Sequence, residues 1–366
     1  MLTTILVFLV VLSILVLIHE FGHFVVAKRS GVLVEEFGFG IPPRVFGIKK
    51  GETIYSINLL PFGGFVRLHG ENTEDGVTDS KRAFINKSKK ARIAIIVAGV
   101  FMNFILAVVT FSIVYFFSGI PRETKNVKIS EVAQNSPAEK AGLLAGDIIR
   151  KVEDRQVYNT DDFIKLVEGS KGSEVRIEIE RGPEMKIVLA SPRANPPEGE
   201  GPLGVVISTT EIYFPPPLIR PFVGIYYGFK DSLTWGKTVI LGFVKIIIDL
   251  TRGTIPKDVA GPVGIFAITS QAQKFGILAV INLMGILSVN LAVLNIFPFP
   301  ALDGGRLLFV VIEAIAGRKV LPKVESTIHT VGMIILLLLI FAITAHDIQR
   351  LIAAGSISGF IDSILK

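Results

Sequence analysis

The chain has 366 residues, of which 50% are hydrophobic, and a mean hydropathy of +0.58, which excludes an ordinary soluble protein. Its formal net charge of +6 is not gathered into a basic patch with interleaved aromatic residues, so it indicates positively charged membrane flanks rather than nucleic-acid binding. The chain contains no cysteine, which excludes disulfides, thiolate metal sites and cysteine nucleophiles, and leaves His, Asp and Glu as metal ligands.

The first apolar run, residues 2–27, predicts a transmembrane helix about 39 Å long. No Lys or Arg precedes the run and it exceeds the apolar core of a signal peptide, so a cleaved signal fits poorly. Lys28 and Arg29 follow at once. Because positive flanks stay cytoplasmic, we expect the N-terminus outside the cell membrane.

Inside this run lies His19-Glu20-Phe21-Gly22-His23, an H-E-x-x-H motif. Ionisable residues within a membrane span are expensive and by default mark a functional site. His19 and His23 are four residues apart, so on a helix both imidazoles project from one face and can hold one metal ion, while Glu20 can handle protons for a metal-bound water. The alternative, two histidines satisfied by neighbouring carbonyls, is costly inside a membrane helix.

A membrane-associated β-hairpin is predicted after the first span. Residues 38–43 are apolar and rich in helix breakers, which indicates a re-entrant loop. Residues 52–60 partly alternate and 65–68 form a return strand, joined by a turn that contains Gly63 and Gly64. An exposed edge of this hairpin, with both glycines, is a candidate for pairing with an extended substrate peptide. A purely structural hairpin is the alternative.

The second span is predicted at residues 93–119, and a segment of soluble composition, residues 122–210, follows it. Ser136 before Pro137 indicates the capped start of a short helix between strands. Residues 222–252 are apolar enough to imitate a span, but their charged residues fall within about a third of the helix circumference, which predicts an amphipathic helix on the membrane surface.

The third span, residues 277–299, carries Asn290 and Asn295 and leads to Asp303. Running from outside to inside, it brings Asp303 to the depth of the two histidines, and catalytic zinc usually has three protein ligands. Asp303 is therefore the candidate third ligand; its alternative role is the N-cap of a short helix starting at Gly304. A fourth span at 328–345 places the C-terminus outside.

In this order the motifs resemble the site-2 protease family of intramembrane zinc metalloproteases, most closely the bacterial regulator-of-sigma-E-protease type. The resemblance rests on the H-E-x-x-H motif, Gly38-Phe39-Gly40, the segment 61–66 and the segment 295–305 that contains Leu302-Asp303-Gly304. It implies Zn²⁺ held by His19, His23 and Asp303, Glu20 as catalytic acid and base, and Asn290 and Asn295 near the substrate. It also implies that residues 122–210 are one extracytoplasmic PDZ domain, where members of this subgroup often carry two.

We therefore expect a multi-pass α-helical membrane protein with four transmembrane helices, a membrane-associated β-hairpin and one extracytoplasmic α+β PDZ domain. The expected parts are an N-terminal transmembrane half (1–121, with the loop and hairpin at 38–68), the PDZ domain (122–210), an interfacial region (211–255) and a C-terminal transmembrane half (256–366).

The expected function is intramembrane cleavage of transmembrane segments of membrane proteins, such as pre-cleaved anti-sigma factors or signal-peptide remnants, at the cytoplasmic side of a bacterial inner membrane. Lipid, and peptide C-termini at the PDZ domain, are the other expected partners; nucleic acid is not one. A divalent-metal transporter and a non-catalytic PDZ membrane adaptor remain the alternatives.

Overall fold

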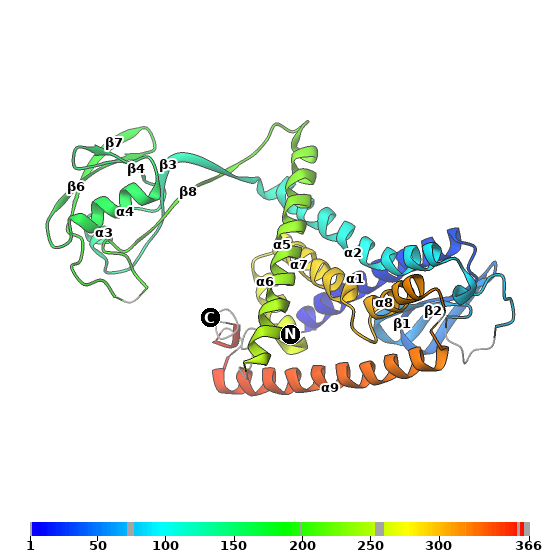
Figure 1. The fold of residues 1–366 in the computed structure, drawn as a ribbon. Helices are drawn as coiled ribbons and strands as arrows, with labels where there is room; N and C mark the ends of the chain where they lie inside the picture. Colours follow the sequence, from blue (N-terminus) through cyan, green and yellow to red (C-terminus); the bar gives the residue numbers. More distant parts are fainter. Residues whose placement is uncertain are drawn as a thin grey trace. The chain divides into compact units, whose positions relative to one another are not determined.

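The computed structural model describes residues 2–71, 77–197, 199–252, 260–318, 320–356 and 359–361 (Figure 1). The chain divides into two compact units, one of Met1–Phe117 with Pro217–Lys366 and one of Ser118–Pro216. The expected boundary between residues 255 and 256 lies outside the described residues, and the division into four parts stays a prediction.

The first unit is built from helices and one bulged β-structure. Among the described residues, four helices are long and apolar enough to cross a membrane. These are α1 (Leu2–Arg29), α2 (Lys89–Ser118), α7 (Ile277–Ile296) and α9 (Pro322–Ala354). Each contains most of one expected span. The third is shorter than expected because Phe297 leaves the helical conformation before Pro298, as residues that precede proline tend to do.

Shorter or less apolar helices complete this unit. They are η2 (Phe84–Asn86), α5 (Arg220–Thr251), α6 (Pro262–Lys274) and α8 (Asp303–Ala316). Helix α5 covers the expected amphipathic segment almost residue for residue, and its Phe229 and Phe243 rings contact α2 and the end of α7. Its position on a membrane surface stays a prediction.

Strands β1 (Val34–Lys50) and β2 (Thr53–Leu68) form a sheet that doubles back on itself. Phe37 pairs with Val66 on one side and with Tyr55 on the other. Residues 36–39 therefore lie between two segments of β2, and one outer edge is formed by 64–68. The interpretation of residues 38–43 as a loop is wrong, because these residues belong to β1; several register shifts accommodate their glycines and prolines.

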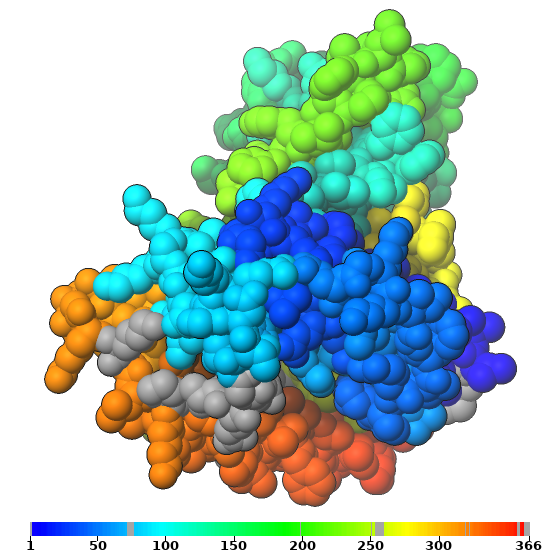
Figure 2. All heavy atoms as spheres, turned by 90° about the vertical axis from the view of Figure 1, so that its right-hand side faces the viewer, coloured from blue at the N-terminus to red at the C-terminus, as the bar shows by residue number. Residues whose placement is uncertain are grey.

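The sheet presents large apolar side chains to its surroundings. Val45, Phe46, Ile48 and Leu59 are each more than half exposed. Figure 2 looks onto the side of the first unit that carries β1 and β2, drawn in mid-blue. Exposed apolar surface gathered on one element is typical of a membrane or ligand contact.

The described residues of the second unit form a six-stranded sheet with two helices. Its strands are β3 (Ile120–Val132), β4 (Ile148–Val152), β5 (Arg155–Gln156), β6 (Val175–Arg181), β7 (Glu184–Ala190) and β8 (Val205–Tyr213), in the order β7-β6-β4-β3-β8 with β5 beside β4. The helices are α3 (Pro137–Lys140) and α4 (Thr160–Gly169). The expected cap is confirmed, since Ser136 Oγ accepts the Glu139 N–H at 3.1 Å.

A buried ion pair joins the loop before β4 to the end of β6. Asp147, 1% exposed, accepts Arg181 Nε–H and Nη2–H, both at 2.7 Å, and the Leu144 N–H at 2.9 Å. Burial alone raises the pKa of Asp147, but the hydrogen bonds from Arg181 and Leu144 outweigh it and bring this pKa below its ordinary value. An aspartate with a lowered folded pKa stabilises the fold above its unfolded pKa and loses that effect as pH falls.

We expect Asp147→Asn to lower the free energy of opening of the second unit at pH 7 by about 2 kcal/mol, because Arg181 loses its charged acceptor. The difference from wild type should shrink as pH falls below about 4. Hydrogen exchange of amides 118–216 in the full chain, corrected for intrinsic rates, measures it. Glu168→Gln, at an exposed ion pair with Lys171, is the control and should change little. A pH-independent difference would contradict the prediction.

Candidate active site

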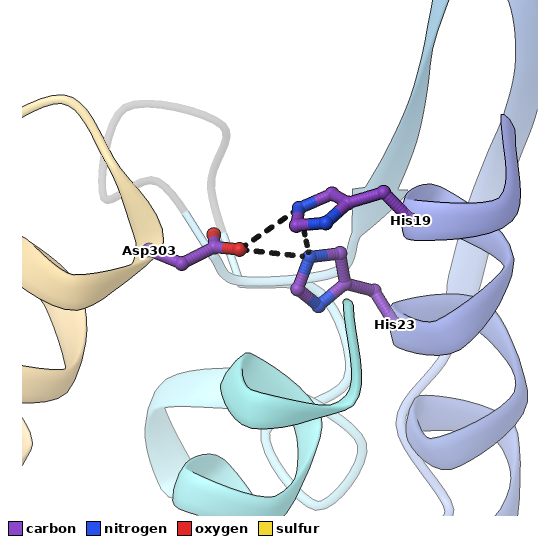
Figure 3. A group of neighbouring side chains, drawn as sticks. All are labelled: His19, His23 and Asp303. Carbon is purple, nitrogen blue, oxygen red and sulfur yellow. Dashed lines mark hydrogen bonds and ion pairs between the residues drawn. The ribbon is translucent and has the colours of Figure 1, made fainter. Parts of the chain in front are cut away.

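The side chains of three residues from two distant parts of the chain meet at one point (Figure 3). His19 and His23 project from the same face of α1, as their spacing predicts, and Asp303 is the first residue of α8. Asp303 Oδ2 lies 3.0 Å from His19 Nε2 and 3.1 Å from His23 Nε2, and the two Nε2 atoms are 3.1 Å apart. Both imidazoles are buried.

This donor set suits a zinc ion. Two neutral imidazoles and one carboxylate are a common set for catalytic zinc. Ligand atoms about 2.0 Å from a tetrahedral ion lie about 3.3 Å from one another, close to the spacing observed here. Asp303 Oδ2 is buried without a hydrogen-bond partner although the two ring nitrogens surround it. Lone pairs that converge in this way call for a cation between them.

Neighbouring groups on α2 orient the two imidazoles. His23 Nδ1–H donates to the Ile95 carbonyl at 2.8 Å, which leaves the Nε2 lone pair for a metal. Asn103 Nδ2 lies 3.4 Å from His19 Nδ1, and the amide oxygen of Asn103 is buried without a partner. Turning the Asn103 amide over satisfies that oxygen with the His19 Nδ1–H and gives His19 the same tautomer as His23.

Gly99 makes room for the imidazoles on α2. A Cβ atom at this position would strike His23 Nε2 and come within 2.7 Å of His19 Cε1. The close approach of α2 to the two imidazoles therefore depends on the absence of a side chain at residue 99.

Glu20 lies beside His19, His23 and Asp303 and lines two cavities. Its Oε2 accepts the Val66 N–H at 3.1 Å, at the outer edge of the β1–β2 sheet. One cavity, of about 230 Å³, is shared by Glu20, His19, Asp303 and Asn295 with neighbouring residues. The other, of about 220 Å³, runs past Glu20, His23 and Asp303 along the 65–68 edge. Glu20 is thus within reach of whatever occupies either cavity.

The residues expected to contact substrate differ in their position relative to the two cavities and the sheet edge. Asn295 lines the first cavity, whereas Asn290 is absent from the described lining of both. Gly64 lies on the outer edge of the sheet, where a Cβ atom would come within 3.9 Å of Glu20 Cγ, and Gly63 precedes it at a φ of +81°. Their roles toward a substrate stay predictions.

Asp303 does not cap α8, since Leu302 is the N-cap residue. Asp303 therefore does not have the alternative role of N-cap residue for the short helix. One turn further along α8, Arg306 forms an ion pair with Glu71, and both line the second cavity. Sequence reasoning missed this pair, and it also missed Asn103; a lone amide in an otherwise apolar span was the signal for the latter.

Comparisons with known proteins match most of the chain. The model of Peptidase family M50 matches residues 7–339. A Clostridium perfringens protein described as "Putative zinc metalloprotease" is 36% identical over 340 residues, covering 93% of this chain and 97% of the relative. Zinc metalloprotease RasP of Oceanobacillus iheyensis is 30% identical over 438 residues, covering 95% of this chain and 99% of the relative.

A solved structure, the PDZ domain of an SdrC-like protein from Listeria monocytogenes, is 22% identical and covers 24% of this chain and 90% of its own, with a TM-score of 0.21.

We expect Gly99→Ala to abolish metal binding while the protein stays folded, because the new methyl group displaces both imidazoles and alanine favours a helix more than glycine does. Metal content of the purified full chain measures this. Gly242→Ala, on α5 where a Cβ meets nothing within 4 Å, is the matched control and should keep the metal. A Gly99→Ala protein with full metal content would contradict the geometry.

Proposed function

The chain belongs to Peptidase family M50, and from this premise we propose that it is an intramembrane zinc metalloendopeptidase that cleaves transmembrane segments of other membrane proteins. Membership of the family makes the chain a zinc metalloprotease of the membrane. The ligand set, the catalytic residue, the substrates and the orientation are the proposed part.

One observation carries the proposal: His19, His23 and Asp303 converge within about 3 Å of one another beside Glu20, and α1 is apolar enough to span a membrane. Ionisable groups buried in such a helix are retained for function rather than stability. We propose these three residues as the zinc ligands. Zinc bound there would lower the pKa of a water molecule toward about 7 and polarise a peptide carbonyl.

Glu20 is proposed as the general base and acid. Its carboxylate lies next to the ligand cluster and faces both cavities, so it can take a proton from the attacking water and pass it to the leaving amine. Asn295, on the wall of the first cavity, can donate to a substrate carbonyl.

The free edge of β2 is proposed to hold the substrate in extended form. Val66 N–H and Leu68 N–H both point away from β1, since they donate to Glu20 and Glu71. A peptide added along this edge would take over these donors and run beside the second cavity to His23 and Asp303. A helical substrate must unwind because its carbonyls are otherwise occupied, and pairing with this edge stabilises the unwound form.

The proposed location is the inner membrane of a bacterium, with both termini outside and the active site toward the cytoplasm. Lys28 and Arg29 at the end of α1 support this orientation. The exposed apolar residues of the β1–β2 sheet suit contact with lipid. The Ser118–Pro216 unit is proposed as an extracytoplasmic PDZ domain that binds peptide C-termini or screens substrates.

Among substrates, pre-cleaved anti-sigma factors and signal-peptide remnants suit a site that accepts one unwound membrane segment. A metal transporter would need polar residues at several depths, and a PDZ adaptor gives no role to Glu20. The ligand cluster beside Glu20 therefore favours the protease.

We expect Glu20→Gln to abolish cleavage of a transmembrane model substrate and to leave bound zinc unchanged, because glutamine cannot accept the proton of the water. His23→Ala and Asp303→Ala should lose both zinc and activity. Zinc content and cleavage by the full chain in proteoliposomes are the two measurements. Full cleavage by Glu20→Gln, or full zinc in Asp303→Ala, would overturn the assignment.

We expect Val66→Pro to lower kcat/KM by about tenfold or more with zinc retained, because proline removes one edge donor without breaking the β1–β2 ladder. Val66→Ala keeps the N–H and is the matched control. Equal kcat/KM values for the proline and alanine variants would argue against strand addition at this edge.

A further inference from the structure

Helix α9 is held to the rest of the first unit by few contacts. In the described part of α9, Gly332 and Asp347 are buried, His329 is half-buried and most other residues are exposed. A Cβ atom on Gly332 would strike Pro300, so the helix backbone lies directly against that residue. The contacts of His329 and Gly332 therefore fall on the segment just before Asp303.

This segment is a tight turn with an unusual residue in it. Leu302 N–H donates to the Phe299 carbonyl at 3.2 Å, Pro300 occupies the second position, and Ala301 in the third has a φ of +78°. These features describe a type II β-turn, in which the third position normally requires glycine or asparagine. Alanine with the same flanking residues favours a type I turn with a negative φ, in which the central peptide plane is flipped over.

His329 supports the unusual form. The Ala301 N–H belongs to that central peptide and donates to His329 Nδ1 at 3.0 Å. The ring also contacts Phe309 on α8, with centroids 5.6 Å apart. Because a flip of the peptide would turn the Ala301 N–H away, the imidazole stabilises the type II turn over the type I turn.

The turn sets the direction in which the chain enters α8. Ala301, Leu302 and Asp303 together line the first cavity, and α8 begins at Asp303. In such a flip the changes in ψ of Pro300 and φ of Ala301 largely compensate, but a rotation of roughly 40° remains. This rotation would displace the Asp303 carboxylate, two residues downstream, relative to His19 and His23.

We propose that His329 is a positioning residue of the metal site: by accepting the Ala301 N–H it holds the Pro300-Ala301 turn in the form that directs Asp303 at the two histidines. The proposal rests on Asp303 being a metal ligand, as inferred above. Among the described residues His329 lies outside the group that could hold the metal, and because its Nδ1 accepts a backbone N–H, Nε2 carries the proton of the neutral ring. It acts from a different helix on backbone geometry.

The test compares variants that remove or restore this one contact in the full chain. His329→Gln should weaken zinc binding roughly tenfold or more, since its amide cannot take the place of Nδ1. His329→Asn should bind like wild type, because the Asn Oδ1 stands where Nδ1 stood. Glycine at position 301 adopts a positive φ without the hydrogen bond to His329. Ala301→Gly should therefore restore zinc affinity when combined with His329→Gln.

Two readouts report on the ligand set without relying on activity. Chelator competition gives the zinc dissociation constant, and the visible spectrum of the cobalt-substituted protein shows whether the carboxylate still coordinates. Ala301→Val provides a second route with His329 intact: a β-branched residue resists a positive φ, and we expect it to weaken zinc binding in the same way.

The outcomes separate the two proposals. If Asp303→Ala binds zinc as tightly as wild type, the ligand set itself fails. If Asp303→Ala loses zinc but His329→Gln keeps the wild-type affinity and cobalt spectrum, only the positioning role fails. It also fails if Ala301→Gly does not restore the affinity of a folded His329→Gln protein.

Discussion

The structure depends on one unfavourable arrangement: three lone pairs directed at a single point inside an apolar helix bundle. Asp303 Oδ2 and the two imidazole Nε2 atoms lie within about 3 Å of one another, and the carboxylate oxygen has no hydrogen bond to compensate it. Such an arrangement is stable only with a cation among the donors, or when the surrounding fold imposes it. The groups around these three side chains impose the arrangement in this second way. The Ile95 carbonyl and the Asn103 amide orient the rings, and Gly99 lets α2 approach them.

The β1–β2 sheet contributes backbone N–H donors to the same site. In the described part of the chain, no neighbouring strand accepts hydrogen bonds from these donors. Residues 36–39 are paired on both sides, so the unpaired edge is moved outward to 64–68, where it reaches Glu20. An exposed edge is normally a liability. Here Glu20 and Glu71 occupy two of its N–H groups, and Arg306 on α8 is paired with Glu71. The same edge is therefore satisfied in the free protein and available to an extended peptide that displaces the two carboxylates.

Much of the site could be predicted from the sequence, because its strongest signals are periodic or costly. A spacing of four residues places His19 and His23 on one helix face, and alternating span direction brings Asp303 to their level. Both inferences agree with the geometry. Residues 38–43 were misjudged because glycine and proline normally indicate a loop, and pairing on both sides within a bulged sheet leaves no local pattern. The contacts of Asn103 and His329 were missed for a related reason, since each joins parts of the chain that are distant in sequence.

Helix α9 shows how tertiary contacts can override local preference. Two polar contacts between its described residues and the rest of the unit end on backbone N–H groups that regular structure leaves unpaired. His329 accepts the N–H of Ala301, and Asp347 Oδ2 accepts the N–H groups of Gly261 and Gly264 at the start of α6, each at 2.9 Å. In an apolar environment an unpaired N–H is expensive, so each contact decides which loop conformation is stable. A largely exposed helix thereby contacts the turn that leads into Asp303, the proposed metal ligand.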